Sequence, residues 1–255
     1  MRVHVVSDVH GRADALASSG EGADVLVCLG DLILFMDYHD HAGGIMGSLF
    51  GADAVSEFIE LRTARRFDEA RDYSRGLWAT LGEDRQSVIE QAVRQQYAAM
   101  LGVLPDPTYL TYGNVDVPPL LREFLRPGIH LLDGQVVEIG GLRFGFVGGG
   151  LQTPMRTPME VPDDEYAAKL EAVGAVDVLC THIPPQLPDL VYDTTARRYE
   201  RGSVALLESI RRTQPAYALF GHVHQPLVAE VTIGATRCVN VGHFRARRTP
   251  YVLDL

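Results

Sequence analysis

Side chains that carry oxygen or nitrogen donors follow five separate apolar runs of this sequence. In chain order they are Asp8, His10, Asp31, Asn114, His182, His222 and His224. Carboxylate, amide and imidazole groups that meet at one point are typical ligands of divalent metals. Seven such donors without a cysteine suit a pair of transition ions such as Mn²⁺, Fe²⁺ or Zn²⁺. The residue types therefore predict a metal centre, provided that the five runs bring their ends together.

The five apolar runs are typical of buried β-strands. They cover residues 2–7, 25–29, 109–112, 176–180 and 216–220. In open α/β sheets, ligands bind beyond the carboxyl ends of the strands. Taken singly, a histidine after a strand is more often a hydrogen-bonded structural residue, and Asn114 after a glycine is more often a turn residue. Five coincidences at strand ends are less easily explained, so the joint pattern favours one shared site.

Further strands and helices indicate a mixed α/β chain. Residues 136–139 and 142–147 flank Gly140-Gly141, a pair that predicts a β-hairpin. Other expected strands cover residues 130–132, 228–233, 238–241 and 251–253. Expected helices cover residues 12–19, 118–125, 164–172 and 203–212. The antiparallel hairpin beside buried strands predicts mixed sheets.

Residues 34–104 differ from the rest of the chain in the pattern of their apolar residues. They show no strand pattern, and their apolar residues keep helical spacing, which predicts two or three helices inserted between neighbouring strands. The insertion begins directly after Asp31, so it should start near the same strand-end surface. It is either a helical cap beside the site or an extra layer packed on the edge of the domain.

The order of the donor blocks resembles that of the calcineurin-like metallophosphoesterases. The family's blocks run Asp-x-His, Gly-Asp, Gly-Asn, a lone His and Gly-His-x-His. Here they stand as Asp8-Val-His10, Gly30-Asp31, Gly113-Asn114, His182 and Gly221-His-Val-His224. The resemblance implies an α/β (α+β) fold in which two mixed β-sheets pack as a sandwich flanked by helices. It covers residues 1–255 as a single domain, while the helical insertion at 34–104 receives no role from it.

The resemblance also implies a division of the ligands between two divalent metal ions. Asp8, His10, Asp31 and His224 would hold the first ion. Asp31, Asn114, His182 and His222 would hold the second, so that Asp31 bridges the two. Such a pair lowers the pKa of a shared water and clamps phosphoryl oxygens. The implied activity is hydrolysis of phosphate esters by a hydroxide that bridges two ions of Mn, Fe or Zn.

One position departs from the family pattern. Many members carry a histidine directly after the Asn of the third block, where it protonates the leaving oxygen, but this chain has Val115. Loss of a general acid penalises alkoxide leaving groups most. The departure favours phosphodiesters with acidic leaving groups, or a substitute donor such as Asp116, His39 or His41. The alternatives are a phosphomonoesterase, protein phosphatases included, and a non-catalytic scaffold that binds other proteins.

Several basic side chains are candidates for contacts with the substrate. His39 and His41 stand at the start of the insertion, and His243 and Arg245 follow the Asn240-Val-Gly242 turn. Imidazole and guanidinium groups bind phosphate oxygens well. We therefore expect His39, His41 and Arg245 to contact substrate, although a solvated charge run explains residues 243–248 equally well.

The composition limits the classes of partner. The chain has 255 residues and a formal net charge of −10, which argues against general nucleic-acid or anionic-membrane binding. No apolar run approaches 18 residues, and the three cysteines lie sparsely in strand-like runs. We expect a cytoplasmic protein that takes a phosphorylated small-molecule or nucleotide-like substrate, with metal ions supplying the positive charge.

Overall fold

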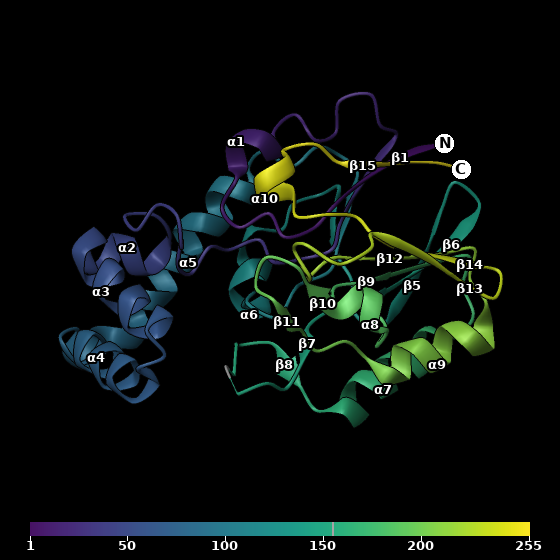
Figure 1. The fold of residues 1–255 in the computed structure, drawn as a ribbon. Coiled ribbons are helices and arrows are strands. Elements are labelled where there is room, and N and C mark those ends of the chain that lie inside the picture. The colour runs from purple at the N-terminus through teal and green to yellow at the C-terminus, as the bar shows by residue number, and fades with distance from the viewer. Residues whose placement is uncertain (155) are drawn as a thin grey trace.

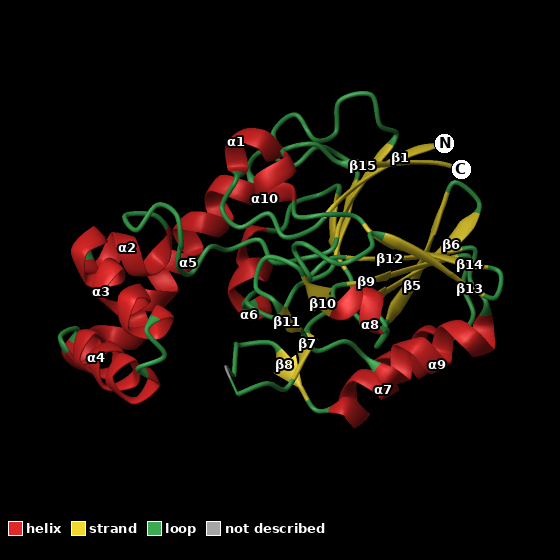
Figure 2. Cartoon of the chain, viewed as in Figure 1, coloured by secondary structure: helices red, strands yellow, loops and turns green. Residues whose placement is uncertain are grey.

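Two β-sheets pack face to face, and helices cover the outer face of each sheet (Figures 1 and 2). The computed structural model describes residues 1–154 and 156–255. The first sheet contains β1 (Arg2–Val6), β2 (Val25–Cys28), β3 (Thr108–Leu110), β4 (Ile129–Leu131) and β15 (Tyr251–Asp254). Its order is β15-β1-β2-β3-β4, with β1 to β4 parallel and β15 antiparallel to β1.

The second sheet has the same mixed character. It contains β5 (Gln135–Ile139), β6 (Leu142–Val147), β9 (Val178–Thr181), β12 (Tyr217–Phe220), β13 (Glu230–Ile233) and β14 (Thr236–Asn240). The inner strands β6, β9, β12 and β14 are parallel, and the edge strands β5 and β13 are antiparallel to their neighbours. The predicted sandwich of two mixed sheets is therefore confirmed. Two short pairs, β7 (Gly150–Leu151) with β8 (Glu160–Val161) and β10 (Tyr192–Asp193) with β11 (Arg198–Tyr199), lie outside it.

The hairpin prediction is also confirmed. β5 and β6 pair antiparallel, and Ile139 lies opposite Leu142. Gly140 and Gly141 between them have φ angles of 59° and 82°. Two successive residues with positive φ make the tight turn that matches the twist of paired strands, and glycine adopts this conformation without a steric penalty.

Alternation along the strands builds a core on both faces of the first sheet. Val3 and Val5 of β1 are fully buried between the two sheets. Val6, one step on, lies in a second core beneath the helices. Each fully buried valine contributes on the order of 1.5–3 kcal/mol of transfer free energy. Such two-sided burial fixes the strand register, because a slip by one residue would exchange the two faces.

Helices from several parts of the chain cover the two sheets. The first sheet is covered by α1 (Ala13–Leu16), α5 (Arg85–Leu101), α6 (Pro118–Leu121) and α10 (Phe244–Arg247). The second is covered by α7 (Asp163–Val173) and α9 (Val204–Thr213), with the short α8 (Pro188–Val191) beside them. The helix expected at 12–19 is only one turn long, because Ser18 and Ser19 turn their hydroxyls back onto backbone carbonyls. The 118–125 prediction is met by α6 and a following 3₁₀ turn, Arg122–Phe124.

The insertion holds more helices than predicted. It contains α2 (Gly44–Phe50), α3 (Ala52–Thr63), α4 (Phe67–Ala79), a 3₁₀ turn (Gly82–Asp84) and α5. The prediction of two or three helices was therefore too low, because α2 carries two glycines, which weaken the helical signal. The insertion has a small core of Met46, Val55 and Trp78. It forms the separate helical lobe in Figure 1, and α5 joins this lobe to the outer core of the first sheet.

Candidate metal centre

The seven predicted ligands lie at the carboxyl ends of strands from both sheets. Asp8, Asp31 and Asn114 follow β1, β2 and β3, whereas His182 and His222 follow β9 and β12. The two groups are joined across the sandwich, because the backbone N–H of His222 donates to the Asp8 carboxylate at 2.9 Å. The structure thus gathers the donors of all five sequence blocks at one edge of the sandwich.

Asp31 occupies the middle of this group. Its Oδ2 lies 3.5 Å from Nε2 of His182 and 3.9 Å from Nε2 of His10. The ligand atoms of Asp8, His10 and Asp31 lie within 4.8 Å of one another. One oxygen of a single carboxylate therefore lies close to imidazole nitrogens from two different sequence blocks.

The tautomers of two histidines follow from their backbone contacts. Nδ1 of His10 lies 3.0 Å from the carbonyl of Ile33, and Nδ1 of His182 lies 2.9 Å from the carbonyl of Leu29. A carbonyl only accepts, so Nδ1 carries the proton in both rings and a neutral ring keeps a lone pair on Nε2. Backbone carbonyls orient metal-binding histidines in the same way in other proteins.

The Nε2 atoms of both rings face other groups that can bind a metal ion. Nε2 of His10 lies 3.3 Å from Nε2 of His224, and Nε2 of His182 lies 3.1 Å from Oδ1 of Asn114. Nδ1 of His222 approaches the same Asn114 oxygen at 3.1 Å. Acceptors that face one another repel unless a proton or a cation lies between them. The donor set therefore fits divalent metal ions with nitrogen and oxygen ligands.

The charges of the buried groups are strongly coupled. Burial alone would raise the pKa of Asp31, but His182 and His10 outweigh it and lower the pKa to about 2. Burial alone would lower the pKa of His182, but Asp31 and Asp8 raise it to about 9. A proton on His182 thus balances the carboxylates in the metal-free protein. Metal binding would displace that proton, because a ligating nitrogen must be unprotonated.

The backbone at the centre is strained. Of the nine described non-glycine residues with positive φ, four are predicted ligands: Asp8, His10, Asp31 and His222. Positive φ is costly for residues with a Cβ and recurs at functional sites, where the surrounding structure enforces it. Gly113 allows a close approach of two loops, because a Cβ there would overlap with the Asp31 carboxylate. The glycine before Asn114 is thus required by packing.

Two residues that the sequence did not identify orient the Asn114 amide. Nδ2 of Asn114 donates to the Thr157 hydroxyl at 3.0 Å, and this hydroxyl donates to Glu160 at 2.9 Å. The arrangement directs Oδ1 of Asn114 towards His182 and His222. Asn240 acts similarly on the fifth block, because its Nδ2 donates to the carbonyl of Val223 at 2.9 Å. None of these residues belongs to a recognisable motif, so only the structure reveals them.

Thr157→Val should weaken metal binding without unfolding the chain. Valine keeps the shape of threonine but cannot accept the Asn114 hydrogen bond, so the amide oxygen loses its fixed direction. We expect the Mn²⁺ affinity of the weaker site to fall about 10–100-fold, as is typical when the outer partner of a ligand is removed. Isothermal titration of metal-free protein measures this. Thr80→Val, which removes an exposed hydroxyl on the insertion, should leave the affinity unchanged.

Comparison with known protein families shows which family this chain belongs to. The sequence model described as calcineurin-like phosphoesterase matches residues 1–226, most of the chain and all seven predicted ligands. The chain belongs to the calcineurin-like phosphoesterase family. No curated protein sequence matches it. TT1561 of Thermus thermophilus is similar in structure, with a TM-score of 0.57, 14% sequence identity, and coverage of 99% of this chain and 98% of that one. Another crystal structure gives a TM-score of 0.61 at the same identity and coverage.

Membership of the calcineurin-like phosphoesterases establishes the general chemistry. The chain is a metal-dependent hydrolase of phosphoester bonds, and its substrates are phosphorylated. The family implies divalent metal ions, and the described residues offer donor groups that suit them. Of the described helices, none has the length and apolar character needed to cross a membrane.

Val115 stands beside the centre of this calcineurin-like phosphoesterase. Its backbone N–H donates to Oδ1 of Asp31 at 3.1 Å, and its side chain packs against the outer core of the first sheet. A valine side chain supplies no proton at this place. Asp116, one substitute donor considered from the sequence, is fully buried and accepts from the N–H groups of Leu32 and Gly113 and from the Tyr97 hydroxyl. Asp116 therefore fixes the loops around Asp31 rather than facing a substrate.

The three predicted substrate contacts lie in different surroundings. His39 is exposed and His41 half-buried in the loop before α2. Among the described residues, neither ring contacts any of the seven predicted ligands. Arg245 is already engaged, because its Nη1 donates to the carbonyl of His10 at 2.6 Å and its Nη2 donates to Asp37. Contacts of these three residues with substrate remain predictions.

His243 lies closer to the centre than the sequence indicated. Its ring stacks on that of His224 at 3.9 Å between centroids, with 8° between the planes, and meets the His10 ring edge-on at 5.8 Å. Its Nε2 is buried and has no hydrogen-bond partner among the described residues. Burial and the neighbouring His224 lower the pKa of His243 to about 3. The signal in the sequence was its place just beyond β14, the same position relative to a strand as the other donors.

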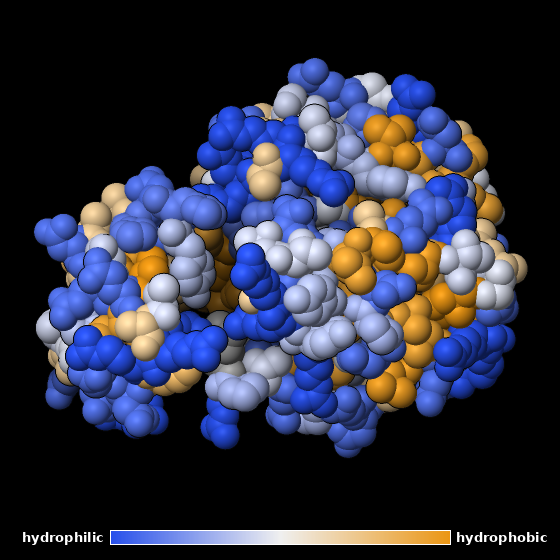
Figure 3. All heavy atoms as spheres, in the orientation of Figure 1, coloured by the Kyte–Doolittle hydropathy of each residue, from blue (hydrophilic) through white to orange (hydrophobic). Residues whose placement is uncertain are grey.

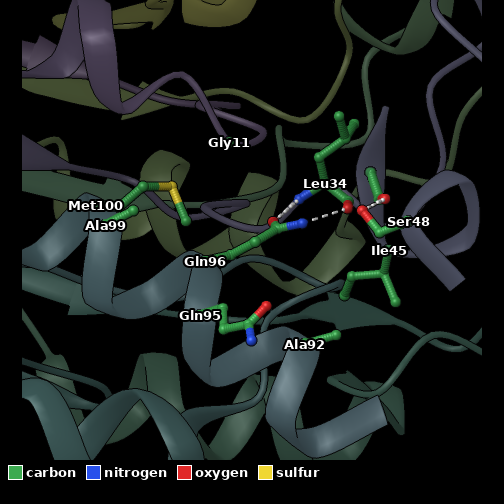
Figure 4. Close-up of a pocket in the computed structure, with 10 residues that line it drawn as sticks. Gly11, Leu34, Ile45, Ser48, Ala92, Gln95, Gln96, Ala99 and Met100 are labelled. Atoms are coloured by element: carbon green, nitrogen blue, oxygen red, sulfur yellow. Dashed lines mark hydrogen bonds between the residues drawn. The ribbon is translucent and has the colours of Figure 1, made fainter. Parts of the chain in front are cut away.

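A pocket of about 270 Å³ lies between the insertion and the strand-end loops. Gly11, directly after His10, lines one side, and α2 and α5 line the other (Figure 4). Gln96 spans the pocket wall, since its amide bonds both the N–H and the carbonyl of Leu34. Figure 3 shows the surface hollowed between the helical lobe and the sandwich, with hydrophobic side chains deep in the hollow.

Proposed function

We propose that this calcineurin-like phosphoesterase hydrolyses phosphodiesters at a centre of two divalent metal ions. The observation that carries the proposal is the position of Asp31, whose Oδ2 lies within 3.9 Å of Nε2 of both His10 and His182. A carboxylate between two donor sets is the arrangement needed to bridge two ions. The two-ion assignment thus rests on the geometry of one buried side chain.

We assign the donors to the two ions according to their neighbours. Asp8, His10 and His224 form one group, because Nε2 of His224 lies 3.5 Å from the Asp8 carboxylate and 3.3 Å from Nε2 of His10. Asn114, His182 and His222 form the other group, because both histidines face the Asn114 amide oxygen. Histidine, carboxylate and amide ligands without thiolate favour Mn²⁺, Fe²⁺ or Zn²⁺.

The residues around the centre prepare it for an anionic substrate. When bound, two divalent ions supply a hydroxide nucleophile at neutral pH and positive charge for the phosphoryl oxygens. Asp8 and Asp31 hold that charge in a buried place, and the carbonyls of Leu29 and Ile33 fix the histidine tautomers. A chain with a net charge of −10 would otherwise repel a phosphate.

Val115 supports a preference for esters with acidic leaving groups. Without a proton donor at this position, the reaction depends on the intrinsic acidity of the leaving group. Alkoxides leave poorly under these conditions, whereas aryl oxides of lower pKa leave more easily. The pocket beside Gly11 offers a place for the organic part of such a substrate, which supports a role for residues 34–104 as a cap. The free, buried cysteines Cys28, Cys180 and Cys238 are consistent with the reducing cytoplasm expected from the sequence.

Paired aryl esters test the proposal. With Mn²⁺ added to the metal-free protein, we expect kcat/KM to be at least about 10-fold higher for bis(p-nitrophenyl) phosphate than for p-nitrophenyl phosphate, because binding of the diester does not require a second negative charge to be accommodated beside Asp8 and Asp31. The leaving group is the same in both, so acidity of the alcohol does not enter the comparison. A monoester preference would reject the diester assignment and leave the metal-dependent hydrolase in place.

A further inference from the structure

The segment after β14 adds a histidine to the centre from outside the matched family region. The family match ends at residue 226, and His243 lies beyond it. β14 runs parallel to β12, the strand that precedes His222 and His224, so its carboxyl end reaches the same edge of the sandwich. We propose that His243 is an eighth metal ligand, which adds an imidazole nitrogen to the His10–His224 side. This inference rests on the proposed function, since it assigns a further donor to the same centre.

The ring of His243 is within reach of an ion on that side. Ring nitrogens of His10, His224 and His243 lie within 4.8 Å of one another. Two nitrogens that bind one tetrahedral ion at about 2.0–2.1 Å are about 3.3–3.4 Å apart. A rotation of the His243 ring that moves its nitrogen by at most about 1.5 Å would therefore bring the three nitrogens around one ion.

Nε2 of His243 lacks a hydrogen-bond partner among the described residues. A buried polar atom without a hydrogen bond costs about 1–3 kcal/mol, and native structures rarely tolerate one without a compensating role. Nε2 of His243 is such an atom among the described residues. This nitrogen lies beside His10 and His224, and a metal ion bound there would supply the partner that it lacks.

The backbone holds this segment against the first metal-binding loop. The N–H of Phe244 donates to the carbonyl of Ser7 at 3.0 Å, and the N–H of Arg245 donates to the carbonyl of Asp8 at 3.1 Å. The Arg245 guanidinium adds its bond to the carbonyl of His10. Three hydrogen bonds therefore fix His243 relative to Asp8 and His10, as a preorganised ligand requires.

Stacking alone is the competing explanation. A neutral imidazole packed on His224 would restrain that ring without binding metal, and a benzene ring at position 243 would do the same. His243→Phe keeps an aromatic face but removes both nitrogens, whereas His243→Ala removes the face as well. The pair of variants separates ligation from stacking.

Isothermal titration calorimetry of the metal-free protein with Mn²⁺ tests the inference. We expect wild type to bind two ions, and His243→Phe and His243→Ala to weaken one site equally, by at least about 10-fold. His130→Phe is the matched control, because His130 also stacks on an aromatic ring, that of Tyr109 at 4.9 Å, and is exposed on the edge strand β4. It should bind Mn²⁺ as wild type does. Circular dichroism of all variants checks that each remains folded.

The outcomes test the role of His243 separately from the proposed two-ion function. If His243→Phe binds both ions with wild-type affinity, His243 is not a ligand, whatever His243→Ala does. A wild-type chain that binds two ions would then leave the proposed function intact. A wild-type chain that binds no Mn²⁺, Fe²⁺ or Zn²⁺ would overturn both the two-ion centre and the role of His243.

Discussion

Asp31→Asn should abolish hydrolysis, with kcat/KM falling by at least about 10³-fold. Asparagine has the shape of aspartate but lacks its negative charge. It therefore cannot bind both ions as a bridging carboxylate does. The loss should exceed the about 10–100-fold cost of removing an outer partner, because a direct ligand shared by two ions is lost. Metal analysis and a Mn²⁺-supplemented diester assay measure it. We expect fewer than two ions per chain.

The control for this substitution is Asp254→Asn. Asp254 is an exposed carboxylate on β15 that pairs with Arg2 at the edge of the first sheet. An exposed pair of this kind contributes little to stability, so both metal content and activity should be unchanged. Wild-type activity of Asp31→Asn, or two ions still bound tightly, would show that Asp31 does not bridge.

Val115→His should change the leaving-group preference by about 10²-fold. An imidazole at this place would stand beside Asp31, where the backbone N–H of residue 115 already contacts the carboxylate. A positioned general acid contributes typically about 10²–10⁴-fold, and most for poor leaving groups. We expect kcat/KM for alkyl phosphate esters to rise by this factor, whereas p-nitrophenyl esters change little. Rates for a series of esters of graded leaving-group pKa give the measurement.

Val115→Leu separates the proton from the packing. Leucine is apolar and close in size, so it disturbs the surrounding core by a similar amount without offering a proton. If Val115→Leu raises the alkyl-ester rate as much as Val115→His, the gain comes from altered packing. An unchanged slope of rate against leaving-group pKa in Val115→His would mean that position 115 does not reach the leaving oxygen.

The structure brings the seven predicted residues together, as the sequence indicated, because strand ends carry a local signal. Each of the seven residues lies within four residues of the end of an apolar run, and glycine at 30, 113 or 221 marks the close approach of two loops. The same rule extends to His243, which follows β14 by three residues. The sequence alone could not show that His243 reaches the centre, because its stacking on His224 depends on how the parallel strands β12 and β14 align.

Features that depend on distant contacts could not be predicted. Thr157 orients Asn114 from 43 residues away, and Arg245 bonds the His10 carbonyl across 235 residues. Neither pairing leaves a periodic pattern in the sequence. The short α2 escaped notice for a different reason, because its glycines oppose the helix that burial of Ile45 and Met46 stabilises. Tertiary packing overrides propensity there.

Helix α5 makes the lobe and the metal loops one mechanical unit. It has 17 residues, about 25 Å of rigid rod, and its Tyr97 hydroxyl bonds Asp116, whose other oxygen holds the N–H of Gly113. The rod also forms a wall of the pocket. One helix therefore carries both a wall of the pocket and a contact to the loop that holds Asn114, so a displacement of α5 would reach both places at once.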